Sequence, residues 1–595
     1  MSAITAARTR SLHPAAVAAP LVLAGAAALR FAGLGRTATD PYYDAAVRSM
    51  GSSWHGFLFG TYEPGGSVAV DKPPVALWLQ VASTKLFGFT TGALLLPGVL
   101  GGCAAVLALY ALLRRLFGVA EAMAGAAALA VLPVSVLTSR SDTMDSLAAA
   151  LSLAAALLVV RAARSDGRWA LPGAGALIGL AFAVKGFQAL LPVPALVVLH
   201  LAASPLPLRR RLARLAPAAG VAVAVGLCWL AVVTAAPGRL QPWAIGSTNG
   251  SAIDATFVYN GVDRLDAAPP RTRTLPAAAA AARPDPPGPL RLTGEGADLD
   301  LRMGVELVPA VLAGLAALVM ATRPFPRPAR AGALMLGTWL ATGVVVLSSM
   351  HELEARYLEA VAPAVAGTLG VGVMTVARRM RAPVWAAALA MAALLLIPLQ
   401  QSVVIARTAA SDSGHIGALP APEVARLSDY LRRHDHGARY EVAGATAVKA
   451  APLIARDGRP VLLLDALAHQ PIVPLDRLLA DVRAGDVRYL LMTAGCRGGR
   501  CGPAVAWAQR NGADVTRRAG LPGRGLLYAL PAARARSALR TRAGRAAGPR
   551  ASAARARGRS RARARSLRRS PARRPAGSAR RSARGPRARR PAPRR

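Results

Sequence analysis

Eleven long apolar runs constrain this 595-residue chain more than any other feature. A helix needs roughly 20 predominantly apolar residues to cross the hydrocarbon core of a bilayer. Runs that approach this length lie at 15–35, 92–113, 118–138, 146–163, 169–184, 187–203, 215–236, 304–322, 331–349, 357–376 and 383–403. Hydrophobic residues make up 53% of the chain, so a soluble Ala-rich enzyme is the weaker interpretation. The sequence therefore predicts an all-α polytopic membrane domain over residues 1–410, with about eleven transmembrane helices.

Lys and Arg in the short loops predict the orientation, because cytoplasmic loops carry an excess of both. Arg-rich segments lie at 8–10, 114–115, 161–168, 209–214, 323–330 and 377–381. They alternate with polar loops that hold most acids and aromatic residues. This alternation predicts a cytoplasmic N-terminus, with everything after about residue 404 outside the cell membrane. The first run has no small-residue cleavage site behind it, so it is expected to remain as an anchor.

Residues 411–530 differ in character from the apolar part. Helical patterns at 422–434 and 475–485 alternate with the strand-like segments VLLLD and VRYLLM. This alternation predicts a small extracytoplasmic α/β domain. Cys496 and Cys501 are spaced to form a small disulfide in an oxidising compartment, and without nearby histidines they make a poor zinc site.

Residues 531–595 form a basic, low-complexity tail. The stretch 532–595 contains 24 Arg and no Asp or Glu, which is over half of the formal net charge of +43. Such a composition predicts disorder. Since the predicted topology places the tail outside the cell, nucleic acid is not an expected partner. Anionic wall polymers or lipid headgroups remain one interpretation, and a partner-free extension remains another.

The first outer loop combines acids, aromatic residues and a lysine. In DPYYDAAVRSMGSSWHGFLF the apolar residues recur every three or four positions, at Tyr43, Val47, Met50, Trp54 and Phe57. This spacing predicts a helix in the membrane interface with its apolar face toward lipid. Asp40 precedes that helix, where a carboxylate can cap the N-terminus or perform chemistry.

Farther along the same loop, Lys72 lies between Asp71 and two prolines in DKPPVALW. Prolines are tolerated at the first turn of a helix, and they stiffen its entry. A lysine near headgroups often extends its ammonium toward water, but one fixed by prolines is a better candidate for binding a lipid phosphate.

Three later sites add charge at the ends of spans. Asp142 and Asp145 are spaced i, i+3, which predicts that they share one helix face. Acids at a helix start also suit the helix dipole, so a structural role is available. Lys185 interrupts the apolar stretch LIGLAFAVKGFQALLPV, and charges at membrane depth usually face a cavity and are functional.

A last polar cluster occurs in HELEARY, which includes His351, Arg356 and Tyr357 at the outer end of a span. Arginine suits phosphate recognition because its planar guanidinium donates two parallel hydrogen bonds.

Together these residues resemble glycosyltransferase family 39, which includes protein O-mannosyltransferases and lipid A aminoarabinose transferases. The likeness is greatest to a bacterial branch of mannosyltransferase-like proteins. In that branch YY-x-AAV-x-SM, SWH-x-F, a Gly-rich step and DKPP-x-x-LW occur in this order, and here they occupy 42–50, 53–57, 65–66 and 71–78. MDSLAAALSLAAA, AVKGFQAL, STNGSAIDATFVYNGVDRL and HELEARYLEAVAPAVA resemble later motifs, and the resemblance spans residues 15 to about 530.

The resemblance implies the type-C membrane glycosyltransferase fold and transfer of a sugar, such as the hexose mannose, from a polyprenyl-phosphate carrier. The acceptor would be a lipid, polysaccharide or protein outside the cytoplasm, and the anomeric carbon would be inverted. Asp40 would be the general base. Since Pro41 stands where the family often has a second acid, Asp44 is the alternative base.

By the same resemblance Lys72, Lys185 and Arg356 would stabilise the leaving phosphate. The other site residues would be Asp71, Asp142, Asp145, His351 and Tyr357. No metal-ligand cluster is assigned, and the sequence leaves a divalent cation, the sugar and the acceptor open.

Two other classes of function fit parts of the chain. A transporter or flippase for lipids or lipid-linked sugars would line a pathway with these charges, but such proteins tend to show internal repeats and helices broken in mid-membrane. No repeat is evident, and the charges gather at one face. A non-catalytic wall-assembly scaffold would not need Asp40 together with DKPP. The sequence therefore favours the transferase.

Overall fold

The computed structural model describes residues 14–164, 167–266, 287–288, 291–293, 311–312, 314–315, 326–351, 353–412, 419–465, 471–493, 496 and 501–539. Residues Met1–Ala533 form one compact unit, and Arg534–Arg595 form a second. Most of the basic tail lies outside the described residues, so its expected disorder stays a prediction.

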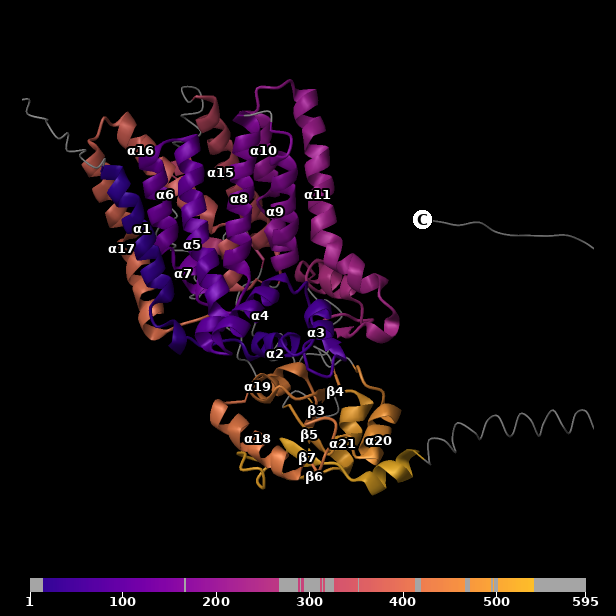
Figure 1. Cartoon of the computed structure of the whole chain (residues 1–595). Coiled ribbons are helices and arrows are strands. Elements are labelled where there is room, and N and C mark those ends of the chain that lie inside the picture. The colour runs from indigo at the N-terminus through magenta and orange to yellow at the C-terminus, as the bar shows by residue number, and fades with distance from the viewer. Residues whose placement is uncertain are drawn as a thin grey trace, which may run out of the picture. The chain divides into compact units, whose positions relative to one another are not determined.

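Apolar helices form a bundle in which the longer ones run side by side (Figure 1). They are α1 (Pro14–Phe31), α5 (Thr91–Leu116), α6 (Val119–Val131), α7 (Pro133–Ser139), α8 (Asp145–Arg164), α9 (Ala170–Lys185), α10 (Val193–Ala203), α11 (Leu208–Ala235), α15 (Arg327–Ser349), α16 (Ala362–Arg379) and α17 (Val384–Thr408). Among the described residues, six helices are long and apolar enough to cross a membrane, or eight if two bent pairs each count as one span. The protein is therefore a multi-pass membrane protein.

The structure differs from the expected spans in detail. The expected span 118–138 is broken between α6 and α7, which meet at 60° where Leu132 precedes Pro133. A residue before proline is pushed out of the helical region, which explains the break. The span expected at 187–203 contains only 11 residues of regular α-helix, α10, after the short 3-10 helix η2 (Gly186–Leu190). The run 304–322 lies mostly outside the described residues, so the number eleven stays a prediction.

Two buried arginines stabilise the end of the bundle where α1 and α7 finish. Arg140 donates to the carbonyls of Arg30 and Ala32 at 3.0 and 2.6 Å. The guanidinium of Arg30 donates to Ala130 O and to Ser135 Oγ, both at 3.0 Å. Arg140 thus caps carbonyls at the C-terminus of α1 that have no partner within the helix, and both side chains tie α1 to α6 and α7.

The segment between α1 and α5 contributes a second layer across one end of the bundle (Figure 1). It contains η1 (Leu34–Arg36), α2 (Pro41–Met50), α3 (Trp54–Phe59), β1 (Val68–Ala69) and α4 (Val75–Phe87). Since α2 is turned 84° from the helix before it, α2 runs across the end of the bundle instead of continuing α1. The strand β1 pairs in parallel with β2 (Trp243–Ala244), so the loop after α11 is fixed to this layer.

The loop after α11 continues as η3 (Gly238–Leu240), the π-helix η4 (Asp254–Tyr259) and η5 (Val262–Arg264). A further short helix, η7, covers Arg291–Thr293, and η9 (Ala355–Ala360) links α15 to α16. Single π-helical turns often mark functional sites, and η4 ends next to Asn260.

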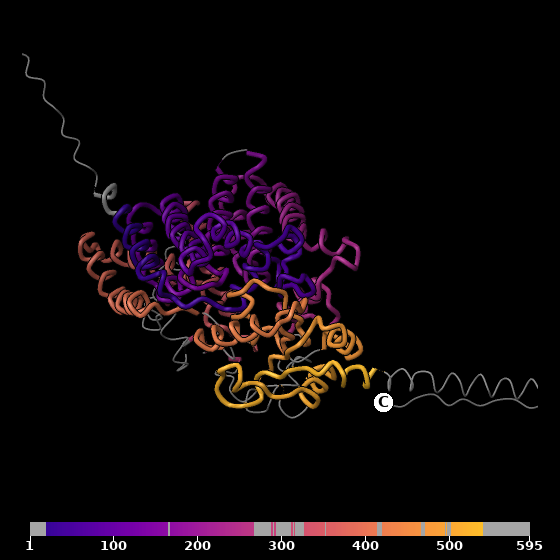
Figure 2. Tube along the Cα trace, turned by 60° about the horizontal axis from the view of Figure 1, so that its bottom comes forward, coloured from indigo at the N-terminus to yellow at the C-terminus, as the bar shows by residue number. Residues whose placement is uncertain are grey.

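The C-terminal part is an α/β domain, traced by the orange and yellow tube in Figure 2. Its elements are α18 (Ala421–His434), β3 (Val442–Gly444), α19 (Ala447–Asp457), β4 (Val461–Leu463), α20 (Leu475–Ala484), β5 (Tyr489–Leu491), α21 (Pro503–Asn511), β6 (Ala513–Asp514) and β7 (Leu527–Ala529). The sheet has the order β4-β3-β5-β7-β6. The strands β4, β3 and β5 are parallel, and β7 is antiparallel to both of its neighbours, β5 and β6. The small α/β fold is confirmed, and Cys496 and Cys501 are joined in a disulfide.

The expectation that one interfacial helix turns its apolar face to lipid is wrong. The helix breaks at Gly51–Ser53 into α2 and α3, and Ser53 caps α3 by accepting from Gly56 N. Val47 and Met50 are each 1% exposed, and they belong to a core shared with residues of α19. The hydroxyl of Tyr62 donates to Ala447 O at 2.9 Å in the same interface. Protein therefore covers the apolar face of α2, although Trp54 on α3 is exposed.

Candidate active site

The sequence builds the start of α2 through local capping. The backbone N–H of Tyr42 donates to Asp40 Oδ1 at 2.9 Å, and Pro41 occupies the first helical position. Proline suits that position because its missing N–H would have no partner in the helix. Asp40 is therefore the N-cap of α2, and this structural role is present whether or not the residue also performs chemistry.

Asp44 lies one turn farther along α2. Its Oδ2 accepts from the Thr39 hydroxyl at 2.6 Å, and the carboxyl lies within hydrogen-bonding reach of Asp142. Burial raises the pKa of Asp44 to about 6. Burial, and then the neighbouring charge of Asp44, raises the pKa of Asp142 well above its usual range.

Asp142 and Asp145 do not share a helix face, which corrects the sequence prediction. Asp142 lies in the turn before α8 and accepts a hydrogen bond from Gln80 Nε2 on α4, whereas Asp145 is the first residue of α8. Asp145 instead pairs with Lys185 at 2.7 Å. Because the helix starts only at residue 145, the i, i+3 rule does not apply to this pair.

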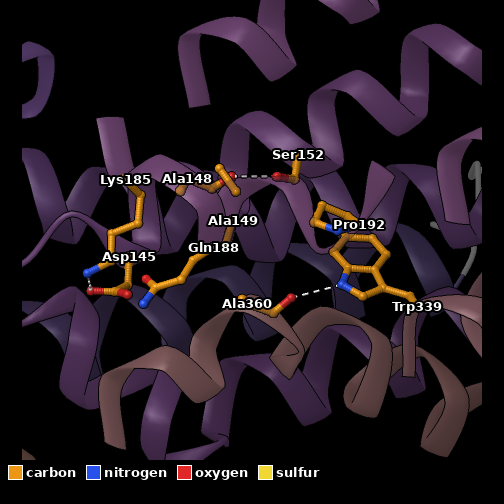
Figure 3. A pocket seen from close by; sticks show the side chains of 10 residues that line it. Asp145, Ala148, Ala149, Ser152, Lys185, Gln188, Pro192, Trp339 and Ala360 are labelled. Carbon is orange, nitrogen blue, oxygen red and sulfur yellow. Dashed lines mark hydrogen bonds and ion pairs between the residues drawn. The ribbon is translucent and has the colours of Figure 1, made fainter. Parts of the chain in front are cut away.

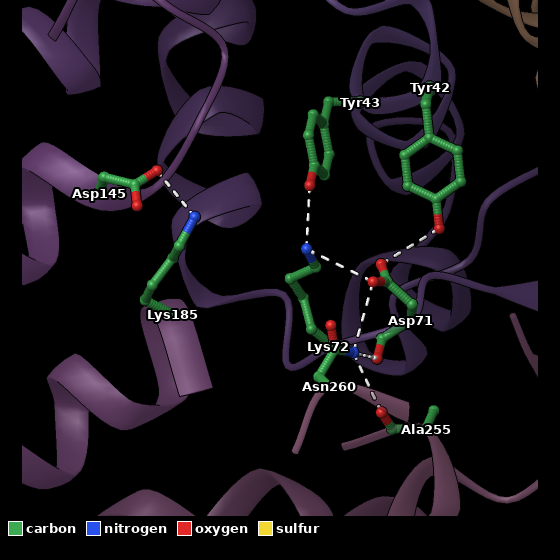
Figure 4. Close-up of polar contacts among 8 residues, drawn as sticks. All are labelled: Tyr42, Tyr43, Asp71, Lys72, Asp145, Lys185, Ala255 and Asn260. Atoms are coloured by element: carbon green, nitrogen blue, oxygen red, sulfur yellow. Dashed lines mark hydrogen bonds and ion pairs between the residues drawn. The ribbon is translucent and has the colours of Figure 1, made fainter. Parts of the chain in front are cut away.

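Lys72 is held by aromatic and acidic partners from α2 and from its own loop (Figure 4). Its Nζ donates to the Tyr43 hydroxyl at 2.9 Å and lies 3.4 Å from Asp71 Oδ2. Burial alone would lower the pKa of Lys72, but the charge of Asp71 and the Tyr43 hydroxyl outweigh it and raise the pKa above its usual value. Lys72 therefore remains a cation at neutral pH.

Asp71 is itself fixed from two sides. The Tyr42 hydroxyl donates to its Oδ1 at 3.2 Å, and Asn260 Nδ2 donates to its backbone carbonyl at 2.6 Å (Figure 4). The network joins α2, the DKPP loop and the segment after η4. It holds the ammonium of Lys72 in place before any ligand binds, which reduces the entropy lost on binding.

Lys185 ends α9 and is almost completely buried with its partner. The side chains of Lys185 and Asp145 are 7% and 4% exposed. The ammonium also lies 5.6 Å from the centre of the Tyr357 ring, within the range of a cation–π contact. A cavity of about 20 Å³ beside the pair is lined by Gln188 and Trp339 among others (Figure 3), which is room for about one water molecule.

Arg356 is the third cation. It lies 3.5 Å from Glu354 and 3.8 Å from Asp412, and its guanidinium lies 5.8 Å from the Tyr357 ring centre. Lys72 and Arg356 are both near enough to act electrostatically on Lys185. The structure thus brings Lys72, Lys185 and Arg356 together around Tyr43 and Tyr357, although they are far apart in sequence. We call these three residues the cation group.

The ring of His351 makes a different contact. Its Nδ1 forms a 2.9 Å hydrogen bond with Leu265 O, and its backbone N–H donates to Arg264 O at 3.0 Å. His351 therefore fixes the loop after η5 to the end of α15. Its described contacts do not join it to the cation group.

An apolar cavity of about 360 Å³ opens beside the site. Its lining includes Leu190, Val346 and Leu347, with the polar side chains of Gln188, Asn260 and Arg264. Gln188 also lines the small cavity next to Lys185, and Asn260 bonds to Asp71. The cavity therefore borders the charged site with a few polar groups, while most of its wall is apolar.

Sequence reasoning did not select Tyr42, Tyr43, Asn260 or Gln80 as site residues. Tyr42 and Tyr43 belong to the motif at 42–50, and Asn260 belongs to STNGSAIDATFVYNGVDRL. The spacing of residues in these motifs does not predict which side chains they contact. Among the described residues, the one group of three acid or cysteine side chains with ligand atoms within 4.8 Å of one another is Asp465, Cys496 and Cys501. Two of these residues are joined in the disulfide, so this group is not assigned as a metal site.

The bundle, the layer of short helices and the charged site at its end define a membrane protein with the type-C glycosyltransferase fold. Residues 71–233 match the family model described as "Dolichyl-phosphate-mannose-protein mannosyltransferase". Residues 427–511 match the model described as "Putative mannosyltransferase YkcB-like, C-terminal". The two matches cover part of the bundle and part of the α/β domain, and over these residues they support the resemblance to glycosyltransferase family 39.

Two Bacillus subtilis (strain 168) proteins are similar to part of the chain. "Putative mannosyltransferase YycA" is 35% identical over 226 residues, which is 38% of this chain and 33% of the relative. "Putative mannosyltransferase YkcB" is 32% identical over 226 residues, 38% of this chain and 32% of the relative. The alignments thus span about a third of these curated relatives.

Solved structures share the fold at low identity. Cupriavidus metallidurans ArnT, crystallised with undecaprenyl phosphate, has a TM-score of 0.52 and 17% identity, and the match covers 86% of this chain and 97% of ArnT. The apo Archaeoglobus fulgidus oligosaccharyltransferase has a TM-score of 0.51 and 14% identity, with 80% of this chain and 69% of that chain covered. At these identities the likeness supports the fold.

Proposed function

We propose that this chain is an inverting membrane glycosyltransferase that moves a sugar, such as the hexose mannose, from a polyprenyl phosphate to an acceptor outside the cytoplasm. The observation that carries the proposal is the cation group beside buried carboxylates and an apolar cavity of about 360 Å³. A lipid-linked sugar phosphate has the same three parts, namely an anionic head, a sugar and an apolar chain. The lipid phosphate bound to ArnT supports this choice of donor.

In the proposed reaction an acceptor hydroxyl attacks the anomeric carbon from the face opposite the phosphate. The new carbon–oxygen bond forms while the bond from the anomeric carbon to the phosphate oxygen breaks, so the centre is inverted. Asp40 takes the proton of the acceptor hydroxyl. The polyprenyl phosphate leaves as an anion, so it needs no proton.

The cation group stabilises the negative charge that grows on the leaving phosphate. Lys72 and Lys185 enter the reaction already fixed by Tyr43 and Asp145, and Arg356 by Glu354. Fixed charges in a site of low dielectric need little reorganisation when the transition state forms. Asp71 holds Lys72, and Tyr357 contacts the charges of both Lys185 and Arg356.

The test uses purified full-length protein in lipid vesicles and a panel of radiolabelled polyprenyl-phosphate sugars with envelope extracts as acceptors. We expect release of polyprenyl phosphate together with label in the acceptor fraction, and loss of both in Lys72→Met. A charge change far from the site, Asp429→Asn on α18, should retain both. Labelled donor that crosses the vesicle membrane without being cleaved would instead identify a flippase.

A further inference from the structure

Two carboxyl groups near Asp40, those of Asp44 and Asp142, are buried next to each other. The Thr39 hydroxyl donates to Asp44 Oδ2, and Gln80 donates to Asp142 Oδ1. The remaining oxygens, Asp44 Oδ1 and Asp142 Oδ2, are buried without another hydrogen-bond partner. The two side chains lie within hydrogen-bonding reach, so a hydrogen bond can form between these two carboxyl groups.

Among the described residues, the groups that interact most strongly with these two carboxyls include no positive charge. The described groups that act most strongly on the two carboxyls are each other, Thr39, Gln80 and Asp40, and none is a cation. The packed helix α19 contributes the apolar residues Ala447 and Ala450 to this core. Its cations have other partners, since Lys449 interacts with Glu423 and Arg456 lies 3.9 Å from Asp457. Two buried carboxylates in contact without a cation repel strongly, and the usual outcome is one proton held between them.

We infer that Asp44 and Asp142 share one proton, and that the resulting singly charged pair positions Asp40 and strengthens it as a base. The second part rests on the proposed function. Asp40 and Asp44 are one turn apart on α2, where the N–H of Asp44 donates to the backbone carbonyl of Asp40 at 3.0 Å. A like charge beside a carboxylate disfavours its ionised form, so the charge of the pair makes Asp40 bind a proton more tightly.

The pair also connects three segments that are separate in sequence. Asp44 belongs to α2, Gln80 to α4, and Asp142 to the turn that precedes α8. Gln80 Nε2 also donates to Leu94 O at 3.0 Å, which extends the connection to α5. The shared proton therefore replaces a repulsion by a hydrogen bond at the point where these segments meet.

Infrared difference spectroscopy of the full-length protein tests the shared proton without any substrate. We expect a carbonyl band of a protonated carboxyl group at pH 7 that is lost in both Asp44→Asn and Asp142→Asn. Asp429→Asn should keep it. Bands identical in the wild type and in both single variants would overturn the inference, whatever the enzyme's activity.

The kinetic test separates a positioning role from catalysis. In each single Asn variant the amide replaces the protonated carboxyl and the other residue keeps one negative charge, so we expect a loss of kcat/KM of less than about tenfold. In the double variant neither position 44 nor position 142 carries a charge, so the pKa of Asp40 falls and Asp40 becomes a weaker base. We expect a larger loss and an acid limb of the pH–rate profile shifted down by on the order of one pH unit.

A purely structural role would lower the amount of folded protein without moving the acid limb, and that result would overturn the positioning role. Loss of all turnover in Asp44→Asn with Asp40→Asn active would make Asp44 the base and would also overturn it. Failure of every variant and of the wild type to transfer sugar contradicts the proposed function, while the infrared result still decides whether the proton is shared.

Discussion

Lys185→Met removes one partner of a buried ion pair and also, if the proposed function is right, one phosphate ligand. The side chains of Lys185 and Asp145 are 7% and 4% exposed and 2.7 Å apart. Removing one member of such a pair costs about 3–5 kcal/mol, because the other charge stays buried without its partner. Loss of stability alone would therefore not prove that Lys185 binds the donor.

The double variant Lys185→Met with Asp145→Asn separates the two effects. The second change removes the orphaned charge, so we expect much of the lost stability to return, while donor binding stays at least tenfold weaker than in the wild type. Thermal unfolding in detergent measures the first quantity, and binding of radiolabelled polyprenyl-phosphate mannose measures the second.

A matched control is Arg378→Met, which breaks the pair between Arg378 and the buried Glu121 away from the site. It should lower stability and leave donor affinity intact. Donor binding like that of the wild type in the Lys185→Met/Asp145→Asn protein, once its stability is restored, would contradict a role for Lys185 in donor binding. In that case Lys185 is a structural partner of Asp145 and does not contact the phosphate.

Three further outcomes are expected. The variant Asp40→Asn should fold and bind the donor, but its transfer rate in single-turnover kinetics should fall by a factor on the order of 10² to 10⁴. A transfer rate near that of the wild type would show that Asp40 is not the base. The topology can be tested in a variant in which Cys103 and Cys228 are replaced by Ser. In intact cells, a membrane-impermeant thiol reagent should label Arg433→Cys but not Arg168→Cys. The opposite labelling pattern would invert the proposed topology. Tyr62→Phe removes a hydrogen bond to the carbonyl of Ala447, the first residue of α19, so it should cost about 0.5–1.5 kcal/mol and make the α/β domain more sensitive to protease. Unchanged protease resistance would show that this contact does not hold the domain.

Features that depend on local composition could be predicted from the amino-acid sequence. Long apolar runs are sufficient to predict spans, since a bilayer demands a fixed length of apolar helix whatever the neighbours are. Alternating periods likewise predicted the α/β domain, and the ordered motifs from Tyr42 to Trp78 predicted the family. Lys185 was selected because a charge is conspicuous in apolar sequence. Lys72 was selected from its place before two prolines, and Arg356 from a polar cluster in which its guanidinium suits phosphate.

Which side chains meet depends on how distant segments pack, and this is seen in the folded chain. The cation group draws on three segments that span residues 72 to 356, and no period in the sequence encodes that approach. Asp142 and Asp145 are three residues apart, yet one contacts Gln80 and the other contacts Lys185, because the helix begins between them. From the sequence, the apolar face of α2 was expected to lie against lipid. Amphipathicity shows that a helix face is covered, but it does not show whether lipid or protein covers it. Here α19, almost 400 residues later in the chain, covers Val47 and Met50, since packing between distant segments is set by the whole fold.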